Sequence, residues 1–145
     1  MKTISRWRMA SKQCFQIANS VLRTRYSHLV SPFVPDVTAF SDALRTHGAV
    51  ISGSLALYYF LPEGDWLPND MDVYVSYDEF PALTSTLEND PSLQFLEQKG
   101  PNRETVSSSQ SVDIAEIKKY ITPCNKTIDV IRSRHNTPIS PLLRF

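Results

Sequence analysis

The sequence predicts a single α/β domain, and three observations support this prediction. The chain has 145 residues, a length at which one hydrophobic core is the usual arrangement. Segments with a helical spacing of apolar residues alternate with short apolar runs that are typical of buried strands. Hydrophobic residues make up 41% of the chain and charged residues 21%, as in ordinary globular proteins.

Residues 1–35 are expected to form a basic N-terminal extension. Six basic residues precede the first acidic residue, Asp36, so this segment carries a charge of +6 and the rest of the chain a charge of −6. Its apolar residues recur with a loose helical period until the prolines at 31–35 interrupt it. A helix whose basic side is solvated or touches phosphate fits this pattern, and so does a mitochondrial transit segment.

Cysteine usage and hydropathy indicate the class of protein. Cys14 and Cys124 have no metal-binding or redox spacing, so we expect two reduced thiols in an intracellular protein. The cytoplasm is the expected compartment, with mitochondria as the alternative that the basic N-terminus raises. No apolar run approaches the roughly 20 residues of a membrane helix, and no membrane partner is expected.

The first elements after the extension are a helix and a short strand. Asp36 is a suitable N-cap for a helix that runs to about His47, and Gly48 is a suitable residue to end it. Residues 49–51 are then expected to form a short buried strand. The inner side of the helix is predicted to consist of Phe40, Ala43 and Leu44.

The segment Ser52-Gly-Ser54 is predicted to be the turn into a second helix. Proline, glycine and aspartate at 62–69 indicate a loop, in which we expect Trp66 to be a packed anchor. The apolar side of the second helix is predicted to comprise Leu55, Ala56, Tyr59 and Phe60.

The clearest strand of the sequence is Met71 to Val75. A helix is expected at 77–87, with Pro81 in its first turn. A flexible loop is expected at 107–111. Two further strands are then expected at 112–121 and 127–131, joined across residues 122–126.

Asp70 and Asp72 stand at the start of the clearest strand. Side chains alternate along a strand, so the two carboxylates share one face while Met71, Val73 and Val75 share the other. Acid pairs with this spacing also occur at Glu63/Asp65 and Glu88/Asp90, but those pairs lie in loops, where acids are simply solvated. Two parallel carboxylates on a strand repel each other unless a cation lies between them. Magnesium is held in this way, by one or two carboxylates and the phosphates of a substrate.

Two further features fit the same chemistry. Gly53-Ser54 ends an apolar run and opens a helix, so its backbone N–H groups and the Ser54 hydroxyl could receive a phosphate; a simple helix cap is the alternative. Asp129 lies in the middle of an apolar strand, where an unpaired carboxylate is costly. It therefore either reaches solvent on an exposed face or joins a charged site.

In this order, Gly53-Ser54, Asp70/Asp72 and Asp129 resemble the pattern of the nucleotidyltransferase superfamily. That superfamily includes DNA polymerase beta, poly(A) polymerases, tRNA CCA-adding enzymes and the small antibiotic nucleotidyltransferases. The resemblance extends from about Asp36 to about residue 131. The long insert that contains Trp66, between Ser54 and Asp70, is most similar to that of uncharacterised fungal members.

The resemblance implies a two-layer fold in which helices cover one face of a mixed sheet. A nucleotidyltransferase-like core would span residues 36–135, and residues 136–145 would form a C-terminal tail, in a minimal or truncated relative of the larger members. Gly53 and Ser54 would bind the triphosphate of a nucleoside triphosphate. Asp70 and Asp72 would hold two Mg²⁺ ions, and Asp129 would share one of them.

The implied function is metal-dependent transfer of a nucleoside monophosphate to a hydroxyl of RNA, a protein or a small molecule. Two alternatives stay open. The fold can be an unrelated two-layer α/β sandwich with a solvated acidic strand. The function can be that of a non-catalytic nucleotide-binding or protein-interaction module with the same fold. The sequence does not specify an oligomeric state.

Overall fold

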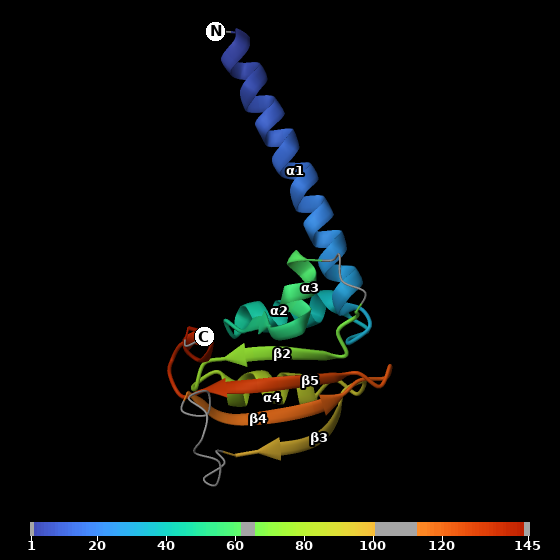
Figure 1. Ribbon diagram of the computed structural model, residues 1–145, viewed down its shortest axis with the longest axis vertical. Coiled ribbons are helices and arrows are strands. Elements are labelled where there is room, and N and C mark those ends of the chain that lie inside the picture. The colour runs from blue at the N-terminus through green and yellow to red at the C-terminus, as the bar shows by residue number, and fades with distance from the viewer. Residues whose placement is uncertain (1, 62–65, 101–112, 144–145) are drawn as a thin grey trace.

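A computed structural model of the chain describes residues 2–61, 66–100 and 113–143, with side chains from residue 10 onward. Within these residues the protein contains a five-stranded mixed sheet and four α-helices (Figure 1). This confirms the predicted α/β class. The loop residues 62–65 and the expected flexible loop at 107–111 lie outside the described residues.

The sheet has the strand order β1-β2-β5-β4-β3. β2 and β5, which are distant in sequence, pair in parallel at its centre, and the other neighbours pair antiparallel. All the strands expected from the sequence are present, and their ends are shifted slightly from the expected residues. The strands are β1 (Val50–Ser52), β2 (Asp70–Val75), β3 (Gln94–Lys99), β4 (Ile114–Ile121) and β5 (Thr127–Ser133).

The helices begin and end largely where local chemistry predicts. The carboxylate of Asp36 accepts a hydrogen bond of 2.9 Å from the N–H of Ala39 and so caps α2. Gly48, just after this helix, has a φ of +58°, the left-handed conformation that favours glycine. The helices are α1 (Lys2–Val30), α2 (Val37–Thr46), α3 (Gly53–Phe60) and α4 (Phe80–Glu88), followed by a 3-10 turn, η2 (Ser140–Leu142).

Two predicted element assignments were incorrect. The helix expected from residue 77 begins at Phe80, because Pro81 has no N–H to donate to the carbonyl of Tyr77, which accepts from Nε of Arg132 instead. Strand β3 was not predicted at all. It is an edge strand whose pairing with β4 is interrupted between Phe95 and Glu97, so its apolar residues do not alternate regularly.

Two predicted packing positions also differ from the structure. Phe60 is 74% exposed, because α3 is short and only Leu55 of this helix is buried. Trp66 is 40% exposed. Its ring contacts that of Tyr58 edge-on with centroids 5.2 Å apart, so Trp66 makes an aromatic contact without being a buried anchor.

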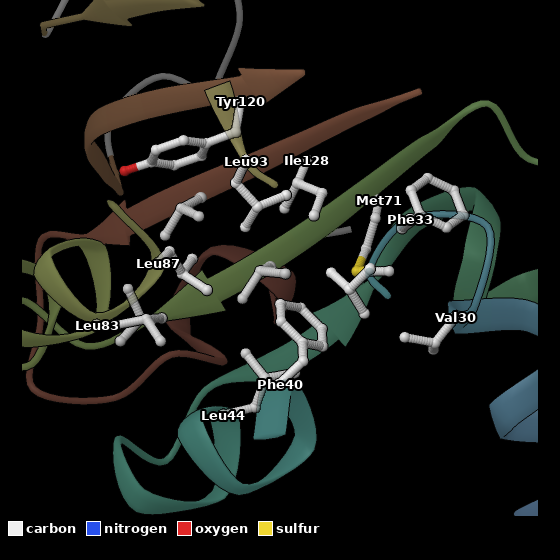
Figure 2. Close-up of a cluster of buried hydrophobic side chains, with 14 of the residues drawn as sticks. Val30, Phe33, Phe40, Leu44, Met71, Leu83, Leu87, Leu93, Tyr120 and Ile128 are labelled. Carbon is white, nitrogen blue, oxygen red and sulfur yellow. The ribbon is translucent and has the colours of Figure 1, made fainter. Parts of the chain in front are cut away.

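The hydrophobic core lies on one face of the sheet (Figure 2). On β2, this face carries Met71, Val73 and Val75, all fully buried. The register places Ile128 and Val130 of β5 beside them. All four helices contribute to this one cluster, through the side chains of Val30, Phe40, Leu44, Leu55, Phe80, Leu83 and Leu87.

Helix α1 joins this core only at its C-terminal end. Val30 is fully buried, whereas every residue from 10 to 18 is exposed, and Figure 1 shows the helix projecting away from the sheet. Within the part of the chain that the structure describes, no helix combines the length and the apolar character needed to cross a membrane.

Candidate functional site

The carboxylates of Asp72 and Asp129 are brought together by the pairing of β2 with β5. The parallel register sets these two residues directly opposite each other, and it sets Asp70 opposite Thr127. Because Met71 and Val73 point into the core, the alternation of the strand turns Asp70 and Asp72 to the other face of the sheet. Asp129 lies on that same open face.

The turn after β1 lies against these carboxylates. β1 pairs antiparallel with β2, and its last residue, Ser52, is opposite Asp72. Gly53 has a φ of +67°, and a Cβ on it would overlap Oδ2 of Asp72 and lie 3.0 Å from its Cγ. The hydroxyl of Ser54 donates a hydrogen bond of 3.1 Å to Oδ1 of Asp70. The long insert between Gly53 and Asp70 therefore does not separate the turn from the acids.

Asp129 has one occupied and one unoccupied carboxylate oxygen. The ammonium nitrogen of Lys119, on the adjacent strand β4, lies 3.2 Å from Oδ2 of Asp129. Oδ1 of Asp129 is buried and has no hydrogen-bond partner. The side chain of Asp129 is 20% exposed, so Asp129 belongs to a charged cluster and is not a freely solvated strand residue.

The pKa values of Asp72 and Asp129 are both raised. Burial raises the pKa of Asp72 from 3.8 to about 6, and the neighbouring charges of Asp70 and Asp129 add to this increase, which Lys119 partly opposes. Burial also raises the pKa of Asp129, against the opposing effect of Lys119. The cluster thus holds more negative charge than the ammonium of Lys119 neutralises, a condition that favours a cation.

Lys126 holds the chain in place just before Asp70. Its ammonium donates to the carbonyl of Pro68 at 2.6 Å and to Oδ1 of Asn69 at 3.4 Å. The N–H of Thr127 donates to the carbonyl of Asn69 at 3.2 Å. These bonds fix the end of the insert at the position where β2 begins, so they contribute to the placement of Asp70.

All five residues singled out in the sequence meet at this point, where β1 ends and β2 and β5 begin. They are Gly53, Ser54, Asp70, Asp72 and Asp129.

Sequence reasoning missed Lys119 and Lys126. A signal for Lys119 was available, because this lysine shares a face of the strand with Ile117 and Ile121 and indicates that this face is in contact with water. The pairing of β4 with β5, which gives Lys119 its partner, cannot be read from the local sequence.

The donor set suits a hard divalent cation such as Mg²⁺, which prefers carboxylate oxygens. The buried, unpaired Oδ1 of Asp129 and the raised pKa of Asp72 both fit a cation at this point. In the described residues, however, no three His, Cys, Asp or Glu side chains are already arranged to hold a metal ion together. Ser54 donates to one oxygen of Asp70 and Lys119 contacts one oxygen of Asp129, so a metal ion would share these two side chains with Ser54 and Lys119.

Comparison of the chain with protein-family models, with curated proteins and with solved structures gave no match.

Proposed function

We propose that the protein is a metal-dependent nucleotidyltransferase-like domain, which transfers a nucleoside monophosphate from a nucleoside triphosphate to a hydroxyl group, with pyrophosphate as the leaving group. The observation that carries the proposal is the register of the sheet. It places Asp72 opposite both Asp129 and the end of β1, so that Gly53 and Ser54 adjoin the carboxylates. The spatial arrangement thus agrees with the ordered pattern in the sequence on which the resemblance rests.

In this proposal, Asp70, Asp72 and Asp129 hold Mg²⁺, with two ions expected. When bound, the metal supplies Lewis-acid stabilisation of the charge on the entering and leaving oxygens of an in-line displacement. The attacking hydroxyl belongs to RNA, a protein or a small molecule.

The residues of the chain have separate tasks in this scheme. The N–H groups at the start of α3 and the hydroxyl of Ser54 bind the triphosphate, because a helix N-terminus favours negative charge. Gly53 lets the backbone approach closely enough for this contact. Asp129 accepts the proton of the attacking hydroxyl.

A second candidate is a non-catalytic nucleotide-binding or interaction module with the same fold. A specific observation favours it. Ser54 and Lys119 already give Asp70 and Asp129 a partner each, so two of the three acids are partly satisfied without a metal. In this alternative the cluster is a stable polar surface, and its charge serves the binding of a partner.

Calorimetric titration with Mg²⁺ and each nucleoside triphosphate separates a protein that binds a nucleotide from an interaction module that binds none, and the turnover of the wild type then separates the enzyme from a non-catalytic nucleotide-binding module. The nucleotidyltransferase proposal expects saturable heat with at least one of the four triphosphates, dependent on Mg²⁺. Absence of heat with all four would reject it and leave the interaction module.

The proposed role of Asp129 is tested by Asp129→Asn, which retains size and removes charge. Nucleotide binding should persist, since Asp70 and Asp72 hold the triphosphate's metal. The turnover rate should fall by about a thousandfold, because the loss is confined to the transition state. Asp42→Asn, on the exposed surface of α2, is the matched control and should retain the wild-type rate. An Asp129→Asn protein with unchanged turnover would remove Asp129 from the mechanism.

A further inference from the structure

The N-terminal part of α1 has no partner within the described structure. Each residue from 10 to 18 is exposed, and burial begins only at the end of the helix that meets the core. Helices of this kind are marginal in water unless one face is packed. Four large apolar side chains lie on this unpacked part: Phe15 is 66% exposed, Ile17 65%, Val21 59% and Leu22 45%.

Over residues 12–24, the apolar residues are segregated on one side of the helix. At 3.6 residues per turn, Phe15, Ile17, Val21 and Leu22 fall within an arc of about 160°. Cys14 and Ala18 fall within the same arc, which Arg25 and His28 enter one turn later. Over residues 12–24, the opposite side carries only polar and basic residues, which are Lys12, Gln13, Gln16, Asn19, Ser20, Arg23 and Thr24.

Helix α3 packs on the same side of α1 and extends its apolar surface. The hydroxyl of Tyr59 donates to the carbonyl of Leu22 at 3.3 Å, and the guanidinium of Arg25 lies 5.6 Å from the centroid of the Tyr59 ring. The next residue, Phe60, is 74% exposed. The arc of about 160° on α1 is itself wider than the narrow seam that one partner helix covers in a coiled coil.

The charge of this segment identifies the chemistry of the occupant. Residues 1–35 contain six basic residues and no acidic residue, and the exposed Lys12 and Arg23 lie on the polar side of the helix. A nucleic acid would complement the charge but leave the apolar arc exposed, and an acidic protein would need an apolar groove as wide as the arc. A bilayer surface with anionic headgroups complements both, because the apolar side enters the acyl boundary and the basic side remains at the headgroups.

We propose that α1 binds the surface of membranes that contain anionic lipids, lying in the plane of the interface with Phe15, Ile17, Val21 and Leu22 in the acyl boundary. Phe60 of α3 adds to this contact. This mode of binding does not require the helix to cross the bilayer, and it departs from the expectation from the sequence that the protein has no membrane partner. It attaches the sheet domain to the membrane through the one end of α1 that joins the core.

Flotation of the full chain with lipid vesicles tests the proposal. We expect strong binding to vesicles of phosphatidylcholine with phosphatidylserine and weak binding to vesicles of phosphatidylcholine alone. Salt should partly release the protein from the anionic vesicles, because it screens the attraction to the headgroups. Equal binding to both vesicle types, or to neither, would overturn the proposal.

Substitutions on the two sides of the helix sharpen the test. Phe15→Gln with Val21→Gln should lower vesicle binding by at least about tenfold, since two large apolar side chains no longer enter the interface. The control Gln16→Ser with Ser20→Gln, on the polar side, should bind like the wild type. All these positions are exposed, and circular dichroism checks that each protein folds. Equal binding by both double variants would contradict the assigned face.

Two other occupants appear as distinct outcomes. If a second copy covers the face, light scattering without lipid would show a dimer that Phe15→Gln with Val21→Gln converts to a monomer. If the basic side binds nucleic acid, anisotropy with single-stranded RNA would show tight binding that these two substitutions leave unchanged. Either result, combined with weak binding to anionic vesicles, would overturn the proposal.

Discussion

The two faces of strand β2 differ sharply, although their residues alternate within the same six positions. One face is apolar and fully buried under the helices, and the other carries Asp70 and Asp72 on the open side of the sheet. Asp72 stands between Met71 and Val73, which are both 0% exposed. Because both neighbours of Asp72 are held in the core, the backbone of Asp72 has little freedom to move. The packing of the buried face therefore fixes the position of the carboxylates on the open face.

The two faces of β2 also make opposite contributions to the stability of the protein. Burial of the apolar face stabilises the fold, whereas the open face brings three carboxylates close to one lysine and raises the pKa of Asp72 to about 6. The open face therefore lowers the stability of the metal-free protein at neutral pH. Charge concentrated at the cost of stability is typical of functional sites.

The largest expected effect comes from the buried face. Met71→Ala should lower the free energy of unfolding by about 2 to 5 kcal/mol, because it leaves a cavity next to the core residues that surround Met71. Chemical denaturation measures this as a shift of the midpoint at constant slope. A loss below about 1 kcal/mol would show that the buried face of β2 is not tightly packed.

Gly53→Ala acts where the open face meets the turn. It should lower the stability by about 1 to 3 kcal/mol, since the left-handed backbone disfavours a side chain and the added methyl overlaps the carboxylate of Asp72. Gly48→Ala is the matched control, because Gly48 has a φ of +58° and open space around its Cβ position.

The difference between the two glycine substitutions isolates the contact with Asp72. Both proteins bear the backbone strain, but only the first displaces a carboxylate. Gly53→Ala should also abolish the Mg²⁺-dependent heat of nucleotide binding, which Gly48→Ala should retain. Equal effects of the two on stability and on binding would mean that Gly53 serves only the geometry of the turn.

A smaller effect is expected in the pH dependence of stability. The folded pKa of Asp72, about 6, exceeds its unfolded value of 3.8, so the folded state binds the additional proton between these values. The contribution of Asp72 therefore stabilises the protein below about pH 4 and is lost as the pH rises through about 6. Full conversion of this shift gives about 3 kcal/mol, which solvent screening of a half-buried group reduces to about 1 to 2 kcal/mol.

Asp72→Asn is the reference for this measurement, because other groups titrate as well. The stability of the wild type minus that of Asp72→Asn should fall between pH 4 and pH 6. Saturating Mg²⁺ should restore the wild type at pH 7 and have little effect near pH 4. A difference that does not change with pH would contradict the coupling between the carboxylates.

The sequence predicted those features that depend on short-range chemistry. The N-cap at Asp36, the stop at Gly48 and the alternation along β2 follow from neighbouring residues, and the structure confirms them. The five candidate site residues were recognised from their order. Their convergence depends on the pairing of β2 with β5, which local sequence does not encode.

The features that sequence reasoning missed depend on distant parts of the chain. β3 is a strand because β4 offers it a partner, and its own residues alternate poorly. Lys119 meets Asp129 only through the register of β4 with β5. Phe60 follows the helical pattern of α3, yet it is exposed because the helix has only a short contact with the body of the protein.

The smallest expected effect is that of Val50→Thr, which forms a matched pair with Val73→Thr on the other face. Val50 lies on the open face, opposite Tyr74, and is 36% exposed. Val73 lies on the covered face and is 0% exposed. Valine to threonine changes one methyl to a hydroxyl at constant shape. Val73→Thr buries that hydroxyl without a ready partner and should lower the stability by about 1 to 3 kcal/mol. Val50→Thr leaves the hydroxyl in contact with water and should change the stability by less than about 0.5 kcal/mol. Thermal unfolding of both variants at one pH measures the contrast. If Val50→Thr cost as much as Val73→Thr, the face that bears the carboxylates would be as dry as the core, and a substrate could not reach the carboxylates from that side.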